Sequence, residues 1–178
     1  MHQTILALAA LLTFSIYMLT RHGVEAEVER SAITAEIEMA ATDVATARLA
    51  VVLSHAFDEA DRGREGSRST TDGLSPIGVP DPDEPAEWAF DDVDDFHGVA
   101  RSTTRPWYTG ELVFTDSVSV RYVNPAAPTA TVTPGVLALA KEVTVTVFAA
   151  PTGAPGSPPI GAQLRQVVTP ASQAPYRH

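Results

Sequence analysis

The first sixty residues carry the clearest pattern of apolar and polar positions. No charged side chain occurs from Gln3 to Thr20, and most residues of this apolar segment (residues 3–20) are Ala, Leu, Ile or other apolar types. From Arg21 onward the chain is rich in Ala, Glu and Val, and apolar residues recur at helical spacing. The pattern predicts one helix over about residues 3–60, roughly 87 Å long at about 1.5 Å per residue. Its second half carries a heptad-like seam formed by Ile33, Ile37, Ala40, Val44, Ala47 and Val51.

Three interpretations of the apolar segment stay open at this point. About 18 helical residues span about 27 Å, just short of a hydrocarbon core of about 30 Å. A cleaved signal peptide usually has a basic start and a small-x-small cleavage site, which are not evident here. The others are a simple membrane anchor and a helix buried first in lipid and then in a protein filament. The residues expected to form such an assembly core are Ile5, Leu6, Leu8, Leu11, Leu12, Phe14, Ile16, Met18 and Leu19.

Gly23 lies where the uniformly apolar half of the helix meets the amphipathic half. A helical Gly costs about 0.5–1 kcal/mol relative to Ala, so it is either a tolerated residue or a weak point at which the helix bends. Just beyond it, Glu25, Glu27 and Glu29 form an acidic cluster, which is typical of a solvated helix face. In a packed bundle these carboxylates would need partners such as Arg21 or Arg30, because an unpaired buried charge costs several kcal/mol.

The remainder of the chain changes character at residue 62. Residues 62–87 are rich in Gly, Pro, Ser, Thr and Asp and predict a long loop. Strand patterns begin after residue 105, at 111–115, 118–123 and 141–148, with a weaker candidate at 163–169. A small antiparallel sheet of this kind needs another layer to be stable, and the helix seam supplies it. We therefore expect an α+β fold.

This fold divides the chain into three parts. The apolar N-terminal helix occupies residues 1–24, and the amphipathic half of the helix with its β-sheet occupies residues 25–150. A Pro-rich tail that includes the last candidate strand occupies residues 151–178.

Composition and motifs exclude several classes of function. The net charge of −10 argues against a nucleic-acid binder, which needs clustered Lys and Arg. The absence of Cys excludes disulfides and thiolate metal sites. No nucleophile elbow, phosphate-binding loop or paired-His metal motif occurs, so we expect no enzymatic activity.

The densest polar motif consists of Asp91, Asp92, Asp94 and Asp95, followed by Phe96. Carboxylates are typical ligands of Ca²⁺, but the spacing does not match an EF-hand loop. Clustered Asp side chains also stabilise turns by accepting hydrogen bonds from backbone N–H groups. Turn stabilisation is the favoured interpretation, and a calcium site is the alternative; no other cofactor is expected.

The order of these segments resembles that of a type IV pilin or pseudopilin. The segment 91–98 is similar to the Asp-Asp-x-Asp-Asp-Phe/Tyr segment of MSHA-type pilin-like proteins, and 56–59, 118–123 and 142–147 also match proteins of that kind. The resemblance covers about residues 1–150. Two departures matter: the Gly-Phe-Thr-Leu-Ile-Glu start of pilins is absent, and Ile5 stands where pilins place a buried Glu. The chain is therefore either a mature form or a divergent relative.

The resemblance implies a structural subunit of an extracellular helical filament. Its partners would be copies of itself, the inner membrane before assembly, and the pilus assembly machinery. The alternatives are a membrane-anchored minor pseudopilin or assembly component that forms no long filament, and a calcium-dependent binding module. Ser/Thr/Pro-rich stretches at 67–80 and 124–134 are candidates for O-glycosylation. The filament's role, whether adhesion, motility, secretion or DNA uptake, stays open.

Overall fold

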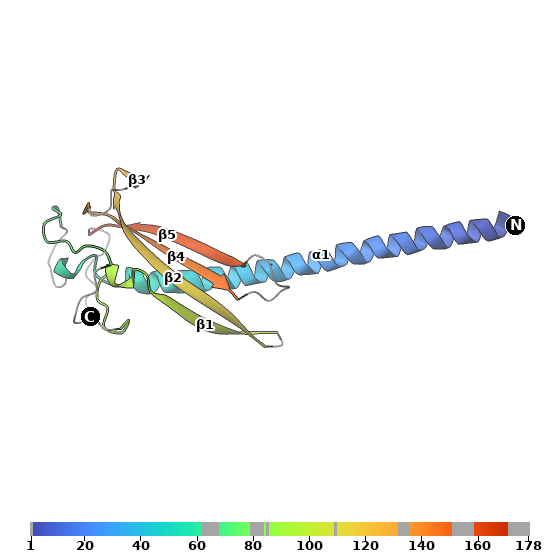
Figure 1. The fold of residues 1–178 in the computed structure, drawn as a ribbon, viewed down its shortest axis with the longest axis horizontal. Helices are drawn as coiled ribbons and strands as arrows, with labels where there is room; N and C mark the ends of the chain where they lie inside the picture. The colour runs from blue at the N-terminus through green and yellow to red at the C-terminus, as the bar shows by residue number, and fades with distance from the viewer. Residues whose placement is uncertain are drawn as a thin grey trace. The chain divides into compact units, whose positions relative to one another are not determined.

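The fold was described from a computed structural model, which places residues 2–61, 68–78, 84, 86–108, 110–131, 136–150 and 159–170. The elements within these ranges are α1 (His2–Leu53), η1 (Glu59–Asp61), η2 (Asp94–Phe96), β1 (Ala100–Trp107), β2 (Gly110–Asn124), β3 (Ala127–Thr131), β4 (Lys141–Ala149) and β5 (Gly161–Val168) (Figure 1). The chain separates into an N-terminal unit, Met1–Met39, and a C-terminal unit, Ala40–His178, and α1 contributes to both. The α+β class, with one long N-terminal helix and an antiparallel sheet, is confirmed.

α1 begins as expected and ends earlier than the predicted residue 60. It continues through Gly23 without interruption, so the bend that this glycine could allow is not seen. The helix stops at Leu53 because the backbone of Ala56 pairs elsewhere: its N–H donates to Asp91 O (3.0 Å), and its carbonyl accepts from Val93 N (3.0 Å). This isolated bridge takes Ala56 out of the helical hydrogen-bond ladder, and the short η1 follows at Glu59–Asp61.

The residues predicted to form the packing seam of α1 differ in their exposure. Ile37 and Val44 are buried, with 1% and 3% of their surface exposed, whereas Ile33 and Val51 are 41% and 43% exposed. The prediction is therefore wrong for Val51, whereas Ile33 belongs to the N-terminal unit and its packing on the sheet stays a prediction. A strict heptad drifts by about 20° per repeat around a straight helix. The buried positions of α1 in the C-terminal unit follow the helical period instead and are Ala41, Val44, Ala45, Arg48, Leu49 and Val52.

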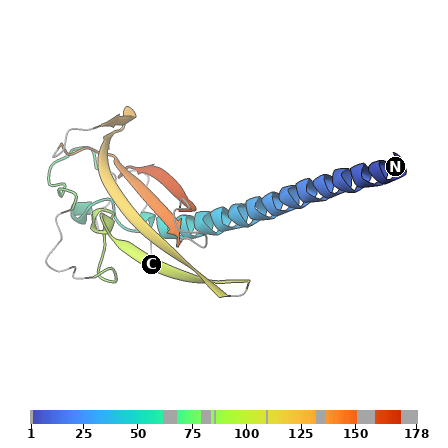
Figure 2. The ribbon, with the colours of Figure 1, turned by 45° about the vertical axis from the view of Figure 1, so that its right-hand side comes forward.

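The C-terminal unit is built on one antiparallel sheet with the strand order β1-β2-β4-β5, and β3 pairs with β2. In both views the last turns of α1 run along one face of this sheet (Figures 1 and 2). Side chains of the two central strands alternate, and those of the face toward α1 are buried: Leu112, Phe114, Asp116, Val118 and Val120 on β2, and Lys141, Val143, Val145, Val147 and Ala149 on β4.

The strands expected over 141–148 and 163–169 are confirmed as β4 and β5. The segments 111–115 and 118–123 form one strand, β2, because polar Asp116 points inward rather than ending the strand. β1 begins at Ala100, before the expected start of the strand region, and β3 lies in a stretch expected to be a connection. β1 is mostly exposed and lacks apolar alternation, so only its backbone pairing with β2 defines it. β5 places residues 161–168 of the expected tail in the sheet.

Candidate functional site

The apolar segment of α1 presents large side chains on every side of the helix. Eight of the nine residues expected to form the assembly core are between 57% and 78% exposed, namely Ile5, Leu6, Leu8, Leu11, Leu12, Phe14, Ile16 and Leu19. Met18, the ninth, is half-buried. Within the described residues, α1 is the one helix long and apolar enough to cross a membrane. A helix that is apolar on every side is normally buried, either in a membrane or among other protein segments.

Two threonine hydroxyls within this segment form hydrogen bonds to carbonyls of the preceding helical turn. The Thr13 hydroxyl donates to the carbonyls of Ala9 (3.0 Å) and Ala10 (2.9 Å), and the Thr20 hydroxyl donates to that of Ile16 (2.9 Å). These hydroxyls therefore need no water, as an apolar environment requires.

Charged residues mark the end of the apolar segment. Arg21 Nε donates to Glu25 Oε1 at 2.9 Å, an i,i+4 ion pair between exposed side chains, and His22 Nδ1 lies 3.7 Å from Glu25 Oε2. Arg21 is one of the two arginines expected to pair with the acidic cluster in a packed bundle, and here it pairs with Glu25 on an exposed helix face. Such exposed pairs contribute only about 0.3–0.5 kcal/mol, so they mark a solvated stretch rather than hold the helix.

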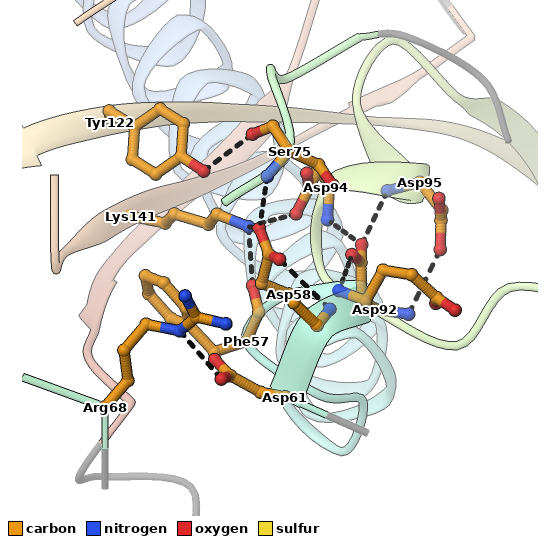
Figure 3. A network of polar contacts seen from close by, with 12 residues as sticks. Phe57, Asp58, Asp61, Arg68, Ser75, Asp92, Asp94, Asp95, Tyr122 and Lys141 are labelled. Atoms are coloured by element: carbon orange, nitrogen blue, oxygen red, sulfur yellow. Dashed lines mark hydrogen bonds and ion pairs between the residues drawn. The ribbon is translucent and has the colours of Figure 1, made fainter. Parts of the chain in front are cut away.

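The Asp-rich motif forms η2 and the turn before it (Figure 3). Asp92 Oδ1 accepts from the backbone N–H groups of Asp94 (2.7 Å) and Asp95 (3.3 Å), and Asp92 Oδ2 accepts from Glu59 N (2.7 Å). Asp95 Oδ2 accepts from the N–H groups of Asp91 (3.2 Å) and Asp92 (3.0 Å). These contacts are the turn-stabilising interactions expected of clustered Asp side chains.

Lys141, at the start of β4, is fully buried beside this turn (Figure 3). Its ammonium donates to Phe57 O (2.5 Å), lies 3.4 Å from Asp58 Oδ2 and makes its closest contact with Asp94 Oδ1. The rings of Phe57 and Tyr122 flank Nζ, with centroids 4.6 Å and 5.3 Å away. The ammonium is therefore held by oxygens and aromatic faces in a site that excludes solvent.

Three carboxyl groups surround the single ammonium of Lys141. Oxygens of Asp58, Asp92 and Asp94 lie within 4.8 Å of one another, and all three residues are buried. Burial, followed by the charge of Asp94, raises the pKa of Asp92 to about 8. Burial also raises the pKa of Asp94, although Lys141 opposes the shift. Asp92 therefore keeps a proton near neutral pH, which reduces the charge that must be buried.

The four Asp residues expected as calcium ligands are divided between two groups. Asp92 and Asp94 join Asp58 around Lys141, while Asp91 joins Glu59 and Glu84, whose oxygens also lie within 4.8 Å of one another. Burial, followed by Asp95, raises the pKa of Glu84 to about 8. In the first group the Lys141 ammonium already supplies a cation. The calcium site stays a prediction, and comparing the thermal midpoint with calcium and with a chelator tests it.

A second buried ionic group links α1 to the sheet. Arg48 Nε lies 3.1 Å from Asp116 Oδ1, and both side chains are fully buried. Glu87 contacts Arg48 Nη1, and Arg101 Nε lies 3.5 Å from the other Asp116 oxygen. Sequence reasoning missed this group and Lys141. The spacing in the sequence could have revealed these residues. Arg48 follows Val44 by four residues and therefore lies on the same face of the helix. Lys141 and Asp116 each lie two residues from an apolar residue of their strand that faces the core, so they lie on the inward face of the sheet.

Comparison of the chain with protein-family models, with curated proteins and with solved structures finds no match.

Proposed function

We propose that this chain is a structural subunit of an extracellular type IV pilus-like helical filament. The observation that carries the proposal is the apolar segment, whose large side chains are exposed on every side of α1. Before assembly, the inner membrane covers this surface. After assembly, the same segments of other subunits cover it, and the C-terminal unit forms the part that faces water.

Keeping this surface away from water is strongly favourable. Relative to water, fully burying one Leu, Ile or Phe side chain contributes about 1.5–3 kcal/mol, so eight such residues contribute on the order of 10–20 kcal/mol per subunit. Lipid supplies this gain before assembly, so the step from membrane to filament is driven by close packing between helices. The apolar segment has no carboxylate, and Ile5 cannot pair with a neighbour's amine. Assembly of this subunit therefore depends on apolar packing alone.

Replacing Leu11 or Leu12 with Asp tests the proposal. A charge in the packed helical core costs several kcal/mol, so filaments should be lost while the C-terminal unit keeps its stability. Electron microscopy of material sheared from cells measures the first effect, and urea unfolding of the detergent-purified chain measures the second. Val136→Asp is the matched control, because Val136 is 50% exposed in the C-terminal unit, and its filaments should be normal. Normal filaments from Leu11→Asp would contradict the proposal.

The alternative function is a membrane-anchored minor pseudopilin or assembly component that forms no long filament. The observation that favours it is that α1 is long and apolar enough to cross a membrane without any partner subunit. The quantity of chain in each fraction separates the two functions. An abundant polymer in the sheared fraction supports the filament subunit, and a trace species confined to membranes supports the anchored component.

A further inference from the structure

We propose that the side chains of Lys141 and Asp94 are joined by an amide bond in the mature protein. The starting observation is the contact between Lys141 Nζ and Asp94 Oδ1, the closest that the ammonium makes. Asp58 Oδ2, the other carboxylate oxygen near Nζ, is 3.4 Å away. The bond would tie the start of β4 to η2, across 47 positions of sequence that contain β1, β2 and β3.

The choice of residue type supports this assignment. Lys141 is the single lysine of the chain, and every other basic side chain apart from histidine is an arginine. Arg is the usual choice for a buried ion pair, because its guanidinium is planar and binds carboxylates through two hydrogen bonds. An ammonium is a poorer structural partner, but after losing a proton it is a nucleophilic amine. The single lysine of the chain therefore lies beside a carboxyl group with which its amine can react.

The surroundings favour condensation over hydrolysis. The side chain of Lys141 has no exposed surface, Asp94 has 7%, and the rings of Phe57 and Tyr122 flank the amine. A carboxyl carbon held beside an amine in a site without water reacts as a unimolecular pair, and water cannot compete. Forming the amide also removes one buried positive charge and one buried negative charge, which are costly to keep desolvated.

The remaining carboxyl groups have separate roles in the reaction. Asp58 accepts hydrogen bonds from Ser75 N (2.9 Å) and Ala60 N (3.2 Å), so its carboxylate is held beside the Lys141 ammonium before the reaction. Asp92 lies against Asp94, and its Oδ1 accepts a hydrogen bond from Asp94 N at 2.7 Å. Asp92 is thus positioned to give a proton to the oxygen that leaves Asp94.

The atoms balance without any other reagent. One proton first moves from the Lys141 ammonium to the Asp94 carboxylate, which leaves a neutral amine beside a carboxylic acid. The amine attacks Cγ of Asp94, so that an Nζ–Cγ bond forms and one Cγ–O bond breaks. The hydroxyl of Asp94 leaves as water after taking a proton from Asp92, and Asp92 takes back the proton that Nζ loses. Nothing is oxidised or reduced.

The mass of the full-length chain, purified in detergent and then denatured, tests the bond. The expected result is a mass lower by one water molecule than the sequence requires, with tandem mass spectrometry of protease fragments showing Lys141 linked to Asp94. Denatured wild-type chain should also take up no amine-reactive label at Lys141. An unmodified mass, full labelling of Lys141, or a link to Asp58 instead would overturn the proposal.

Two variants sharpen the test. Lys141→Arg keeps a cation but cannot form the amide, so it should show the full mass. If the water deficit persists in that variant, it arises elsewhere, for instance from a succinimide at Asp72–Gly73, and the proposal fails. Asp92→Asn should increase at least tenfold the fraction of chain that is not yet cross-linked shortly after synthesis. An unchanged fraction would overturn the role given to Asp92.

Discussion

At the scale of single residues, the C-terminal unit places charges where an apolar core is expected. Arg48, Asp58, Asp116 and Lys141 are all fully buried, and each lies near an opposite charge. Burying an ion pair costs desolvation energy, and its attraction repays this cost only when the geometry is good. Arg48 Nε and Asp116 Oδ1 lie 3.1 Å apart but are not aligned for a hydrogen bond, so this pair repays the cost only in part. Removing one partner is much worse, because the other charge is then buried alone. These residues therefore favour one position of the last turns of α1, and one position of the η2 turn, against the sheet.

The Arg48–Asp116 pair gives a direct prediction. Arg48→Met leaves the Asp116 carboxylate buried without its main partner, and the free energy of unfolding should fall by about 3–5 kcal/mol. The double variant Arg48→Met/Asp116→Leu removes both charges and should recover most of that loss. Urea unfolding followed by Trp fluorescence measures both. A single variant as stable as the wild type would show that the pair contributes nothing.

The raised pKa of Asp92 makes stability depend on pH. The unfolded side chain has a pKa near the ordinary value of 3.8, and the folded one about 8, so the folded chain holds the extra proton between these values. Stability should therefore fall as pH rises from about 5 to 8, by at most about 1.4 kcal/mol per pH unit for this group. Unfolding curves across this range measure the slope, which Asp92→Asn should reduce. Asp43→Asn, on the exposed side of α1, should leave it unchanged. Stability that rises over this interval would contradict the prediction.

At the scale of elements, α1 has two kinds of surface with different partners. Before Thr34 its side chains are almost all exposed, and from Ile37 onward one stripe is buried. The stripe follows a period of 3.6 residues because the helix packs on a sheet. Pairing with a second, supercoiled helix would require a period of 3.5.

Val44 and Val51 provide a matched test of that stripe. They are the same residue type on the same helix, 3% and 43% exposed. Val44→Ala should lower the free energy of unfolding by about 1–3 kcal/mol, because it removes two buried methyl groups. Val51→Ala should change it by less than about 0.5 kcal/mol. Equal losses in the two variants would mean that the stripe is not the packing face.

The glycines that begin β2 and β5 provide a second matched pair. A Cβ at Gly161 would lie 2.2 Å from the carbonyl oxygen of Val147 and 2.9 Å from the Phe148 ring, whereas a Cβ at Gly110 would meet nothing within 4 Å. Gly161→Ala should therefore push β5 away from β4 and cost about 1–3 kcal/mol. Gly110→Ala should be nearly neutral. Thermal midpoints of the two variants measure the difference.

At the scale of the whole molecule, the residues that stabilise the fold and those proposed to drive assembly occupy separate stretches of sequence. The described core contains no side chain before Ile37, and the exposed apolar side chains of α1 are concentrated before Thr20. Stability and assembly can therefore change independently of each other.

Deleting residues 2–30 tests this separation. The shortened chain should be a monomer in buffer without detergent, because the apolar segment is gone. Its free energy of unfolding should match that of the full chain within about 0.5 kcal/mol, since the deleted residues bury no core side chain. Sedimentation and urea unfolding measure the two properties. A large loss of stability would show that the N-terminal stretch supports the fold.

The sequence by itself determined the elements whose patterns are local. α1 follows from an uncharged segment without Gly or Pro and from the Ala- and Glu-rich segment after it. β4 follows from the alternation of Val and Thr. Only the tertiary structure decided the rest, because the deciding contacts join residues far apart in the chain. The Ala56–Asp92 bridge ends α1, backbone pairing with β2 defines β1, and inward-facing Asp116 and Lys141 meet partners from α1 and the turns. Judged from its neighbours in the sequence, a polar side chain is expected on the surface. Its burial costs less free energy only when folding brings an opposite charge from a distant part of the chain beside it.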